Sequence, residues 1–102
     1  MTTSAERAAF VYLLRCGDRS LYCGWTFDVE RRLVAHRTGR GARYTKTRLP
    51  VELVAVLELP DESSARREEA RIKRLSRPEK LALVAAHARV PRRATAAAGP
   101  TR

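Results

Sequence analysis

Short apolar runs and amphipathic stretches follow one another along the chain in a pattern typical of a small mixed domain. Residues 10–15 and 21–25 are apolar and β-prone, and the turn-forming residues 17–20 separate them, so the pattern predicts a β-hairpin. Residues 51–59 predict a third strand. Along one side of that strand the apolar residues alternate: Val51, Leu53, Ala55 and Leu57.

Three other stretches carry helix signals. Asp28 is a suitable N-cap for a helix over residues 29–37, and residues 64–75 predict a second helix. A capping box at residues 76–79 begins a third helix over residues 77–88. The resulting order β-β-α-β-α-α predicts an α+β fold, with helices flanking a small three-stranded antiparallel sheet.

These elements form one predicted domain, residues 10–88. Residues 1–9 are a polar N-terminal extension, and residues 89–102 are predicted to be a disordered basic tail because nothing in them could pack. The N-terminus is too polar for a secretory signal, and no apolar run approaches the ~20 residues of a transmembrane helix. Cys16 and Cys23 lie in apolar runs and predict buried, reduced thiols. We therefore expect a cytoplasmic protein with no membrane partner.

Charge narrows the choice of partner. The formal net charge is +10, from 21 Lys and Arg against 11 Asp and Glu. Such a balance favours polyanions, with nucleic acid first, then ribosomes or acidic membranes. The basic block, residues 31–48, is one-signed, whereas residues 66–69 alternate in sign like an ordinary solvated helix. The cations of the block are Arg31, Arg32, Arg37, Arg40, Arg43, Lys46 and Arg48. We expect this block to contact phosphates, and Tyr44 within it to stack on a base.

Several side chains could act on a phosphodiester, although each has an ordinary explanation as well. Tyr12 and Tyr22 lie in the hairpin, where strand tyrosines usually pack with the hydroxyl at the surface. Arg32 and His36 are four apart and share a helix face, which an exposed arginine and a helix-end histidine would also explain.

Two adjacent carboxylates form the other candidate. Glu69 lies four residues before Lys73, so a salt bridge along the helix would explain it equally well. Glu68 is offset from Glu69 by about 100° on the helix and is the alternative if the register shifts by one.

Two tripeptides, Phe10-Val11-Tyr12 and Tyr22-Cys23-Gly24, resemble the pair that gives the GIY-YIG nuclease family its name. Three more family-like segments follow in order: a helix at residues 28–36, a glycine- and arginine-rich loop at residues 39–45, and a helix at residues 67–75. The resemblance covers residues 10–84 and is strongest to the stand-alone, single-domain bacterial members. The first tripeptide lacks its glycine and the second has Cys23 in place of isoleucine, which affects local packing only.

The resemblance implies a metal-dependent nuclease and gives roles to the candidates. Tyr12 is expected to be the general base or to orient the attacking water, with Tyr22 assisting and His36 as a competing base. A phenol with an ordinary pKa of about 10 needs help to act in this way. Arg32, four residues after Asp28, is expected to stabilise the transition-state charge, and Arg31 to contact the backbone.

The same resemblance implies the cofactor. Glu69 is the expected ligand of Mg²⁺ (or Mn²⁺), since Mg²⁺ accepts few protein ligands and keeps most of its waters. No cluster of Cys and His suggests zinc. Gly24 is expected to turn the backbone out of the strand close to the substrate.

The predicted function is thus a divalent-metal-dependent endonuclease that hydrolyses nucleic acid, with DNA favoured over RNA. The alternative is a non-catalytic basic module that binds DNA, RNA or ribosomes on the same fold. The chain lacks the additional domains of larger family members, so a separate protein partner could supply targeting.

The two tyrosines can act together only if they project from one face of the hairpin. They do so when the residue numbers of each cross-strand pair add up to an even number, as they would if Cys16 lay opposite Ser20. We therefore predict a three- or five-residue connection or a bulge, because a regular two-residue turn would separate them.

Overall fold

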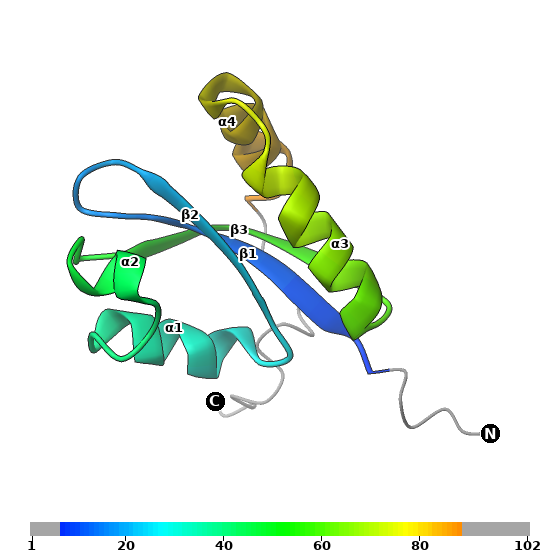
Figure 1. The fold of residues 1–102 in the computed structure, drawn as a ribbon, viewed down its shortest axis with the longest axis horizontal. Coiled ribbons are helices and arrows are strands. Elements are labelled where there is room, and N and C mark those ends of the chain that lie inside the picture. Colours follow the sequence, from blue (N-terminus) through cyan, green and yellow to red (C-terminus); the bar gives the residue numbers. More distant parts are fainter. Residues whose placement is uncertain (1–6, 89–102) are drawn as a thin grey trace.

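The computed structural model describes residues 7–88, and Figure 1 shows their arrangement. The disordered tail predicted over residues 89–102 lies outside this part of the chain, as do residues 1–6 of the extension predicted over residues 1–9. Within it, no helix is long and apolar enough to cross a bilayer.

The α+β prediction is confirmed. Strands β1 (Ala9–Arg15), β2 (Leu21–Thr26) and β3 (Glu52–Leu59) form an antiparallel sheet in the order β2-β1-β3. β1 is therefore the central strand, and β2 lies at one edge of the sheet.

Helix signals in the sequence correspond closely to the observed helices. α1 (Val29–Arg37) begins after Asp28, whose side chain accepts a hydrogen bond from the Arg31 N–H as an N-cap should. α3 (Glu62–Lys73) begins two residues earlier than predicted, because Asp61 provides its N-cap. α4 (Arg77–Ala86) begins with the predicted capping box. The short helix α2 (Arg43–Lys46), within the glycine- and arginine-rich loop, was not predicted.

Helices cover the two faces of the sheet unequally. α1 lies against one face, and α3 lies on the other with α4 beside it (Figure 1). Tyr12 and Leu14 of β1 pack with Val29 of α1 in one cluster, whereas Val11 and Leu13 pack towards α3 in a second. The alternation along β1 thus divides the core into an α1 face and an α3 face, and each candidate side chain belongs to one of them.

The third strand departs from prediction. Val51 and Leu53 join the α1-face core, but Ala55 and Leu57 join the α3-face core, so the predicted alternation along a single side is wrong. A β-bulge is the reason: the register with β1 shifts where Leu13 pairs with Ala55 and Leu14 with Leu53. One extra residue in a strand reverses the facing of every residue beyond it.

Hairpin register bears directly on the site. Tyr12 pairs with Gly24 and Leu14 with Tyr22, so paired numbers have an even sum, and Cys16 N–H donates to the Ser20 carbonyl at 2.9 Å. The prediction of an odd-numbered connection is confirmed. Tyr12 and Tyr22 accordingly project from the same face, with ring centroids 6.4 Å apart.

Candidate active site

A buried chain of hydrogen bonds links the central strand to α1 and α2. The Tyr12 hydroxyl lies 2.8 Å from His36 Nε2, and His36 Nδ1 lies 2.8 Å from Thr45 Oγ1. His36 and Thr45 are fully buried, and Tyr12 is 2% exposed. His36 is therefore not a solvent-facing residue at a helix end, which was the ordinary explanation of its position.

The direction of these hydrogen bonds follows from the single proton of the threonine hydroxyl. Thr45 Oγ1 donates that proton to the Ala42 carbonyl at 3.0 Å, so it accepts from His36 Nδ1–H. The Ala42 N–H is 3.5 Å from Nδ1, too far to compete. With its proton on Nδ1, the imidazole accepts a hydrogen bond from the Tyr12 O–H at Nε2.

Burial fixes the protonation states of both partners. It lowers the pKa of His36 to about 4, with the positive charge of Arg32 as a second cause, so the imidazole is neutral near pH 7. Burial also raises the pKa of Tyr12 to about 12, so the phenol keeps its proton. The phenol thus points its proton at the unprotonated nitrogen of a neutral imidazole.

Arg32 and Tyr22 complete the group on the α1 face. Arg32 Nε donates to the Tyr12 oxygen at 3.4 Å, a long contact that opposes the effect of burial on the tyrosine pKa. The Tyr22 ring lies 5.3 Å from the His36 ring and stacks on Tyr44 at 5.8 Å. Four of the predicted catalytic side chains therefore come together: Tyr12, Tyr22, Arg32 and His36.

A hollow opens beside this group. It has a volume of about 210 Å³ and is lined by Thr26, Asp28, Arg31, Arg32 and Ala35. Arg31 and Arg32 both line it, although they are adjacent on the helix. Two guanidinium groups in one hollow suit a phosphate, which accepts bidentate hydrogen bonds.

Glu69 lies on the other side of the sheet. It belongs to α3, and together with burial its negative charge raises the pKa of Cys23, the β2 residue between Tyr22 and Gly24, to about 12. In the described part of the chain, no hydrogen bond joins Glu69 to the α1-face group. Cys23 belongs to β2, the strand at one edge of the sheet.

The two neighbouring glutamates, Glu68 and Glu69, differ in the number of contacts that their carboxylate oxygens make with cations. Both oxygens of Glu68 accept from Arg71, at 3.1 and 2.6 Å, which lowers the pKa of that carboxyl group. Glu69 has one ion pair, to Lys73 at 3.3 Å, and its side chain is 22% exposed. Both oxygens of Glu68 thus already bind the same guanidinium, whereas Glu69 has only one ion pair.

A single available carboxylate, Glu69, suits a metal site whose remaining ligands are water and substrate. Among residues 7–88 no three His, Cys, Asp or Glu side chains form a group that could hold an ion. A dedicated protein cage of the zinc or calcium type is therefore excluded there. Mg²⁺ and Mn²⁺ bind through one or two carboxylates plus water and substrate phosphate, so Glu69 fits them.

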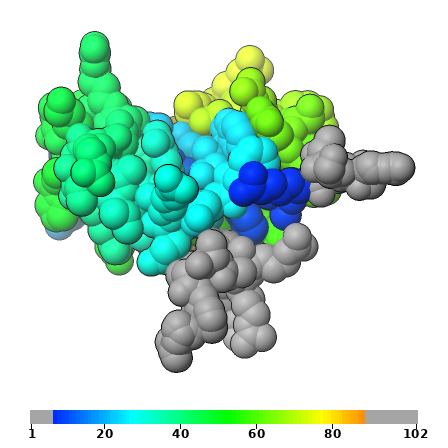
Figure 2. All heavy atoms as spheres, turned by 90° about the horizontal axis from the view of Figure 1, so that it is seen from below, coloured from blue at the N-terminus to red at the C-terminus, as the bar shows by residue number. Residues whose placement is uncertain are grey.

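Most of the basic block faces solvent. Space-filling Figure 2 shows α1 and the loop after it (cyan to green) as a lobe distinct from α3 (lime). The block's exposed cations are Arg31, Arg37, Arg40, Arg43 and Lys46. Within residues 7–88 none of these five makes an ion pair, so their charges are available to phosphates.

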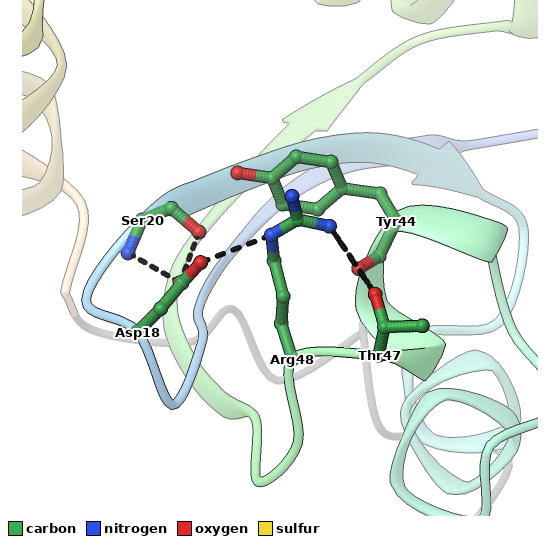
Figure 3. A network of polar contacts seen from close by, with 5 residues as sticks. All are labelled: Asp18, Ser20, Tyr44, Thr47 and Arg48. Atoms are coloured by element: carbon green, nitrogen blue, oxygen red, sulfur yellow. Dashed lines mark hydrogen bonds and ion pairs between the residues drawn. The ribbon is translucent and has the colours of Figure 1, made fainter.

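Arg48 is an exception to the predicted phosphate contacts. Its Nε donates to Asp18 Oδ2 at 2.9 Å, its Nη1 donates to the Tyr44 carbonyl at 3.0 Å, and its guanidinium lies 3.8 Å from the centre of the Tyr44 ring (Figure 3). It holds α2 to the tip of the hairpin. Tyr44 is 37% exposed and its ring contacts Tyr22 and Arg48, so its stacking on a base stays a prediction.

Gly24 does not turn the backbone out of the strand, so the role predicted for it is wrong. Gly24 lies inside β2, paired with Tyr12, and the backbone does not turn out of the strand there. A Cβ at this position would lie 2.5 Å from the Tyr12 hydroxyl oxygen. The glycine therefore makes room for the phenol.

Two residues that hold the site were missed. Thr45 fixes the imidazole tautomer, and a Cβ at Gly41 would overlap the His36 ring. Gly41 was noted only as part of a loop, and a single threonine in an unpredicted helix gives no sequence signal.

Comparison with known proteins defines the class. The GIY-YIG catalytic domain model matches residues 8–82, and the chain belongs to this nuclease family. Its relatives include UPF0213 proteins of Nitratidesulfovibrio vulgaris, 51% identical over 79% of this chain and 74% of that protein, and of Oceanobacillus iheyensis, 51% identical over 74% and 87%.

Solved structures agree with the fold. The chain is similar to a UPF0213 protein of Bacillus halodurans, with a TM-score of 0.53 and 40% identity over 87% of this chain and 95% of that one. A protein of E. faecalis gives a TM-score of 0.55 with 32% identity over 82% and 90%. The predicted likeness to stand-alone bacterial members of the family is thus confirmed.

Proposed function

We propose that the chain is a divalent-metal-dependent endonuclease that hydrolyses phosphodiester bonds in nucleic acid, with DNA as the preferred substrate. The observation that carries this proposal is the buried Tyr12 hydroxyl, which is held between neutral His36 and Arg32 beside a hollow with two arginines. A module that only binds nucleic acid has no use for such a buried, directed proton path. A cytoplasmic location remains part of the proposal.

The geometry provides a way for a protonated tyrosine to act as a base. As water attacks the phosphorus, the Tyr12 oxygen takes a proton from the water and passes its own proton to His36 Nε2. Thr45 keeps the imidazole in the tautomer that can accept it. The tyrosine and the histidine, which the sequence left as competing bases, are in this mechanism two links of one relay.

Charge on the reacting phosphate is the other requirement. Arg32 lines the hollow and can stabilise the oxygens as negative charge grows in the transition state. A divalent ion held by Glu69 would supply Lewis-acid stabilisation of the leaving 3′ oxygen and lower the pKa of bound water. A phosphodiester at the open edge of β2 is within reach of both sides of the sheet.

The direct test is cleavage of labelled branched, single-stranded and duplex DNA, and of matched RNA, with Mg²⁺ or Mn²⁺ and with EDTA. We expect metal-dependent cutting, with DNA preferred. Binding of every substrate without cleavage under any metal would contradict the proposal and leave the non-catalytic binding module.

Adjacent glutamates provide a matched pair of variants. Glu69→Ala should lower kcat by about 10³-fold, because loss of the metal removes several kcal/mol of charge stabilisation. Nucleic-acid binding in EDTA should be unchanged or slightly tighter, since a carboxylate near a polyanion is gone. Glu68→Ala makes the same change of charge one residue away and should keep its activity. The reverse result would move the ligand to Glu68 but leave the nuclease in place.

Arg32 is distinguished from the rest of the basic block by its effect on turnover. Arg32→Ala should lower kcat more than affinity, because its contact strengthens in the transition state. Replacing Arg40, Arg43 and Lys46 by alanine should instead reduce the slope of log affinity against log salt by about two to three units. An unchanged slope would show that these three cations do not touch phosphates.

A further inference from the structure

A second basic hollow lies away from the candidate active site. It has a volume of about 480 Å³, within the range of about 300–1,000 Å³ that is typical of ligand sites. Its lining consists of Arg15 at the end of β1, Cys16, Arg19 at the tip of the hairpin and Arg77 at the start of α4. Of its four lining residues, three are arginines: two from the end of the hairpin and one from α4, about 60 residues further along the chain.

The charges in this hollow are largely uncompensated. In the described part of the chain, neither Arg19 nor Arg77 makes an ion pair. Arg15 pairs with Glu52 at 2.8 Å, but both side chains are more than half exposed, so this pair is weak and exchangeable. Like charges gathered around one hollow repel one another unless an anion occupies it.

Backbone strain at Arg19 is an independent observation. Its φ of 70° lies in the left-handed region, where a residue with a Cβ loses roughly 1–2 kcal/mol relative to glycine. The turn is otherwise well satisfied, because Arg19 N–H donates to the Cys16 carbonyl and Ser20 N–H to Asp18 Oδ1. A glycine would serve the turn better, so the guanidinium has another use.

The geometry points to a second phosphate-binding site, formed by Arg15, Arg19 and Arg77, that holds the nucleic-acid backbone away from the cleaved bond. This inference rests on the proposed function for the nature of the ligand. Guanidinium forks bind phosphate oxygens in pairs, and three of them around one hollow match a phosphodiester. None of these three residues belongs to the basic block.

The position of the hollow fits a strand that passes the edge of the sheet. Arg15 follows Val11 and Leu13 in the alternation of β1, so it is on the α3 face with Glu69, opposite Tyr12. Tyr12 and Arg15 are three residues apart, or roughly 10 Å along the strand. A backbone that passes around β2 would meet Arg32 and Tyr12 on one face of the sheet and the second hollow on the other.

The test compares two double variants of equal charge. Arg19→Gly with Arg77→Ala removes two cations of the hollow, and Arg66→Ala with Arg67→Ala removes two exposed cations of α3. Binding of a 20-base-pair duplex would be measured in EDTA over a range of salt concentrations. The hollow variant should reduce the slope of log affinity against log salt by about two units, whereas the α3 variant should leave the slope unchanged.

Folding is controlled within the same design. Because Arg19→Gly relieves the left-handed backbone, the hollow variant should melt at the same temperature as the wild type or higher. A loss of affinity therefore cannot be ascribed to a damaged turn. An unchanged slope, or an equal decrease in both double variants, would overturn the second site.

Two further measurements separate the alternatives. If the hollow variant differs from the wild type only in its affinity for inorganic phosphate, the hollow takes a free anion and the nucleic-acid contact is refuted. A wild type that never cleaves but shows the slope difference would refute the nuclease while retaining the phosphate site. Cleavage together with an unchanged slope would support the nuclease and refute the second phosphate site.

Discussion

The two faces of the sheet use polar residues in opposite ways. On the α1 face Tyr12, His36 and Thr45 are buried and linked by 2.8 Å hydrogen bonds, and burial shifts the pKa values of Tyr12 and His36. On the α3 face Glu68 and Glu69 lie at the surface of a helix and pair with cations one turn away. The first arrangement is specific to one geometry, whereas the second is common on solvated helices.

This difference shows how the parts of the candidate site depend on one another. Buried polar groups are costly to leave unpaired, so the α1-face chain has one arrangement and is preorganised without substrate. The carboxylates of α3 are not directed by any such network. We infer that the α1 face sets the reaction geometry, and that substrate and metal bring Glu69 into use.

Removing the Tyr12 hydroxyl is the strongest test of the difference between the α1 face and the α3 face. Tyr12→Phe should lower kcat at least about 100-fold, because the first link of the proton relay is lost. Tyr22→Phe is the matched control, since within residues 7–88 the Tyr22 hydroxyl makes no hydrogen bond to the relay, and its loss should be much smaller. Rates of metal-dependent cleavage measure both, with thermal melting to confirm folding. Equal losses would mean that the relay is not what distinguishes Tyr12.

The next largest effect should come from the far end of the relay. Thr45→Val leaves the buried His36 Nδ1–H without its acceptor and should destabilise the fold by about 1–3 kcal/mol. It should also lower kcat more than it raises KM, because the imidazole loses its fixed tautomer. Thr45→Ser keeps the hydroxyl and should restore most of both properties. Failure of serine to rescue would assign Thr45 a packing role only.

A smaller effect is expected from pH. Since the pKa of His36 is about 4 in the fold and about 6.5 in an unfolded chain, the unfolded chain takes up the proton first as pH falls. The free energy of unfolding should therefore be lower at pH 4 than at pH 6.5, and His36→Gln should reduce this dependence. Cleavage should also persist at pH 5.5, because the imidazole is still neutral. An acid limit near pH 6.5 would contradict the burial of His36.

The smallest effects belong to the ion pairs along α3. Lys73→Ala and Arg71→Ala break exposed ion pairs and should change the free energy of unfolding by less than about 1 kcal/mol, as measured by urea denaturation. Destabilisation of several kcal/mol in either variant would show that the two faces differ less than the structure indicates.

Much of the fold could be predicted because its signals are local. Asp28 and the capping box at residues 76–79 mark helix starts in the sequence itself, and the hairpin parity follows from turn length. The bulge in β3 and the helix α2 could not be predicted, since both depend on contacts with distant strands and helices. The bulge interrupts the alternation along β3, so Ala55 and Leu57 lie in the α3-face core.

The site was predictable only in its residue types. Four side chains at family positions were expected to converge, and they lie together. That His36 is buried, and that Arg48 is bound to Asp18, depends on where α2 packs, which no local pattern encodes. Glu69 was expected as the ligand from the family resemblance, and the contacts of Glu68 with Arg71 add a difference between the two carboxylates that the sequence did not show.

The pairing of Gly24 with Tyr12 makes the two tripeptides parts of one steric unit. Any side chain at position 24 would occupy the place of the phenol oxygen and push it away from the imidazole. A single methyl group there would therefore break the Tyr12–His36 hydrogen bond while every candidate catalytic side chain stays in the sequence. In such a chain an inventory of active-site residues would report an intact nuclease, because the defect lies in a space that the motif must leave empty.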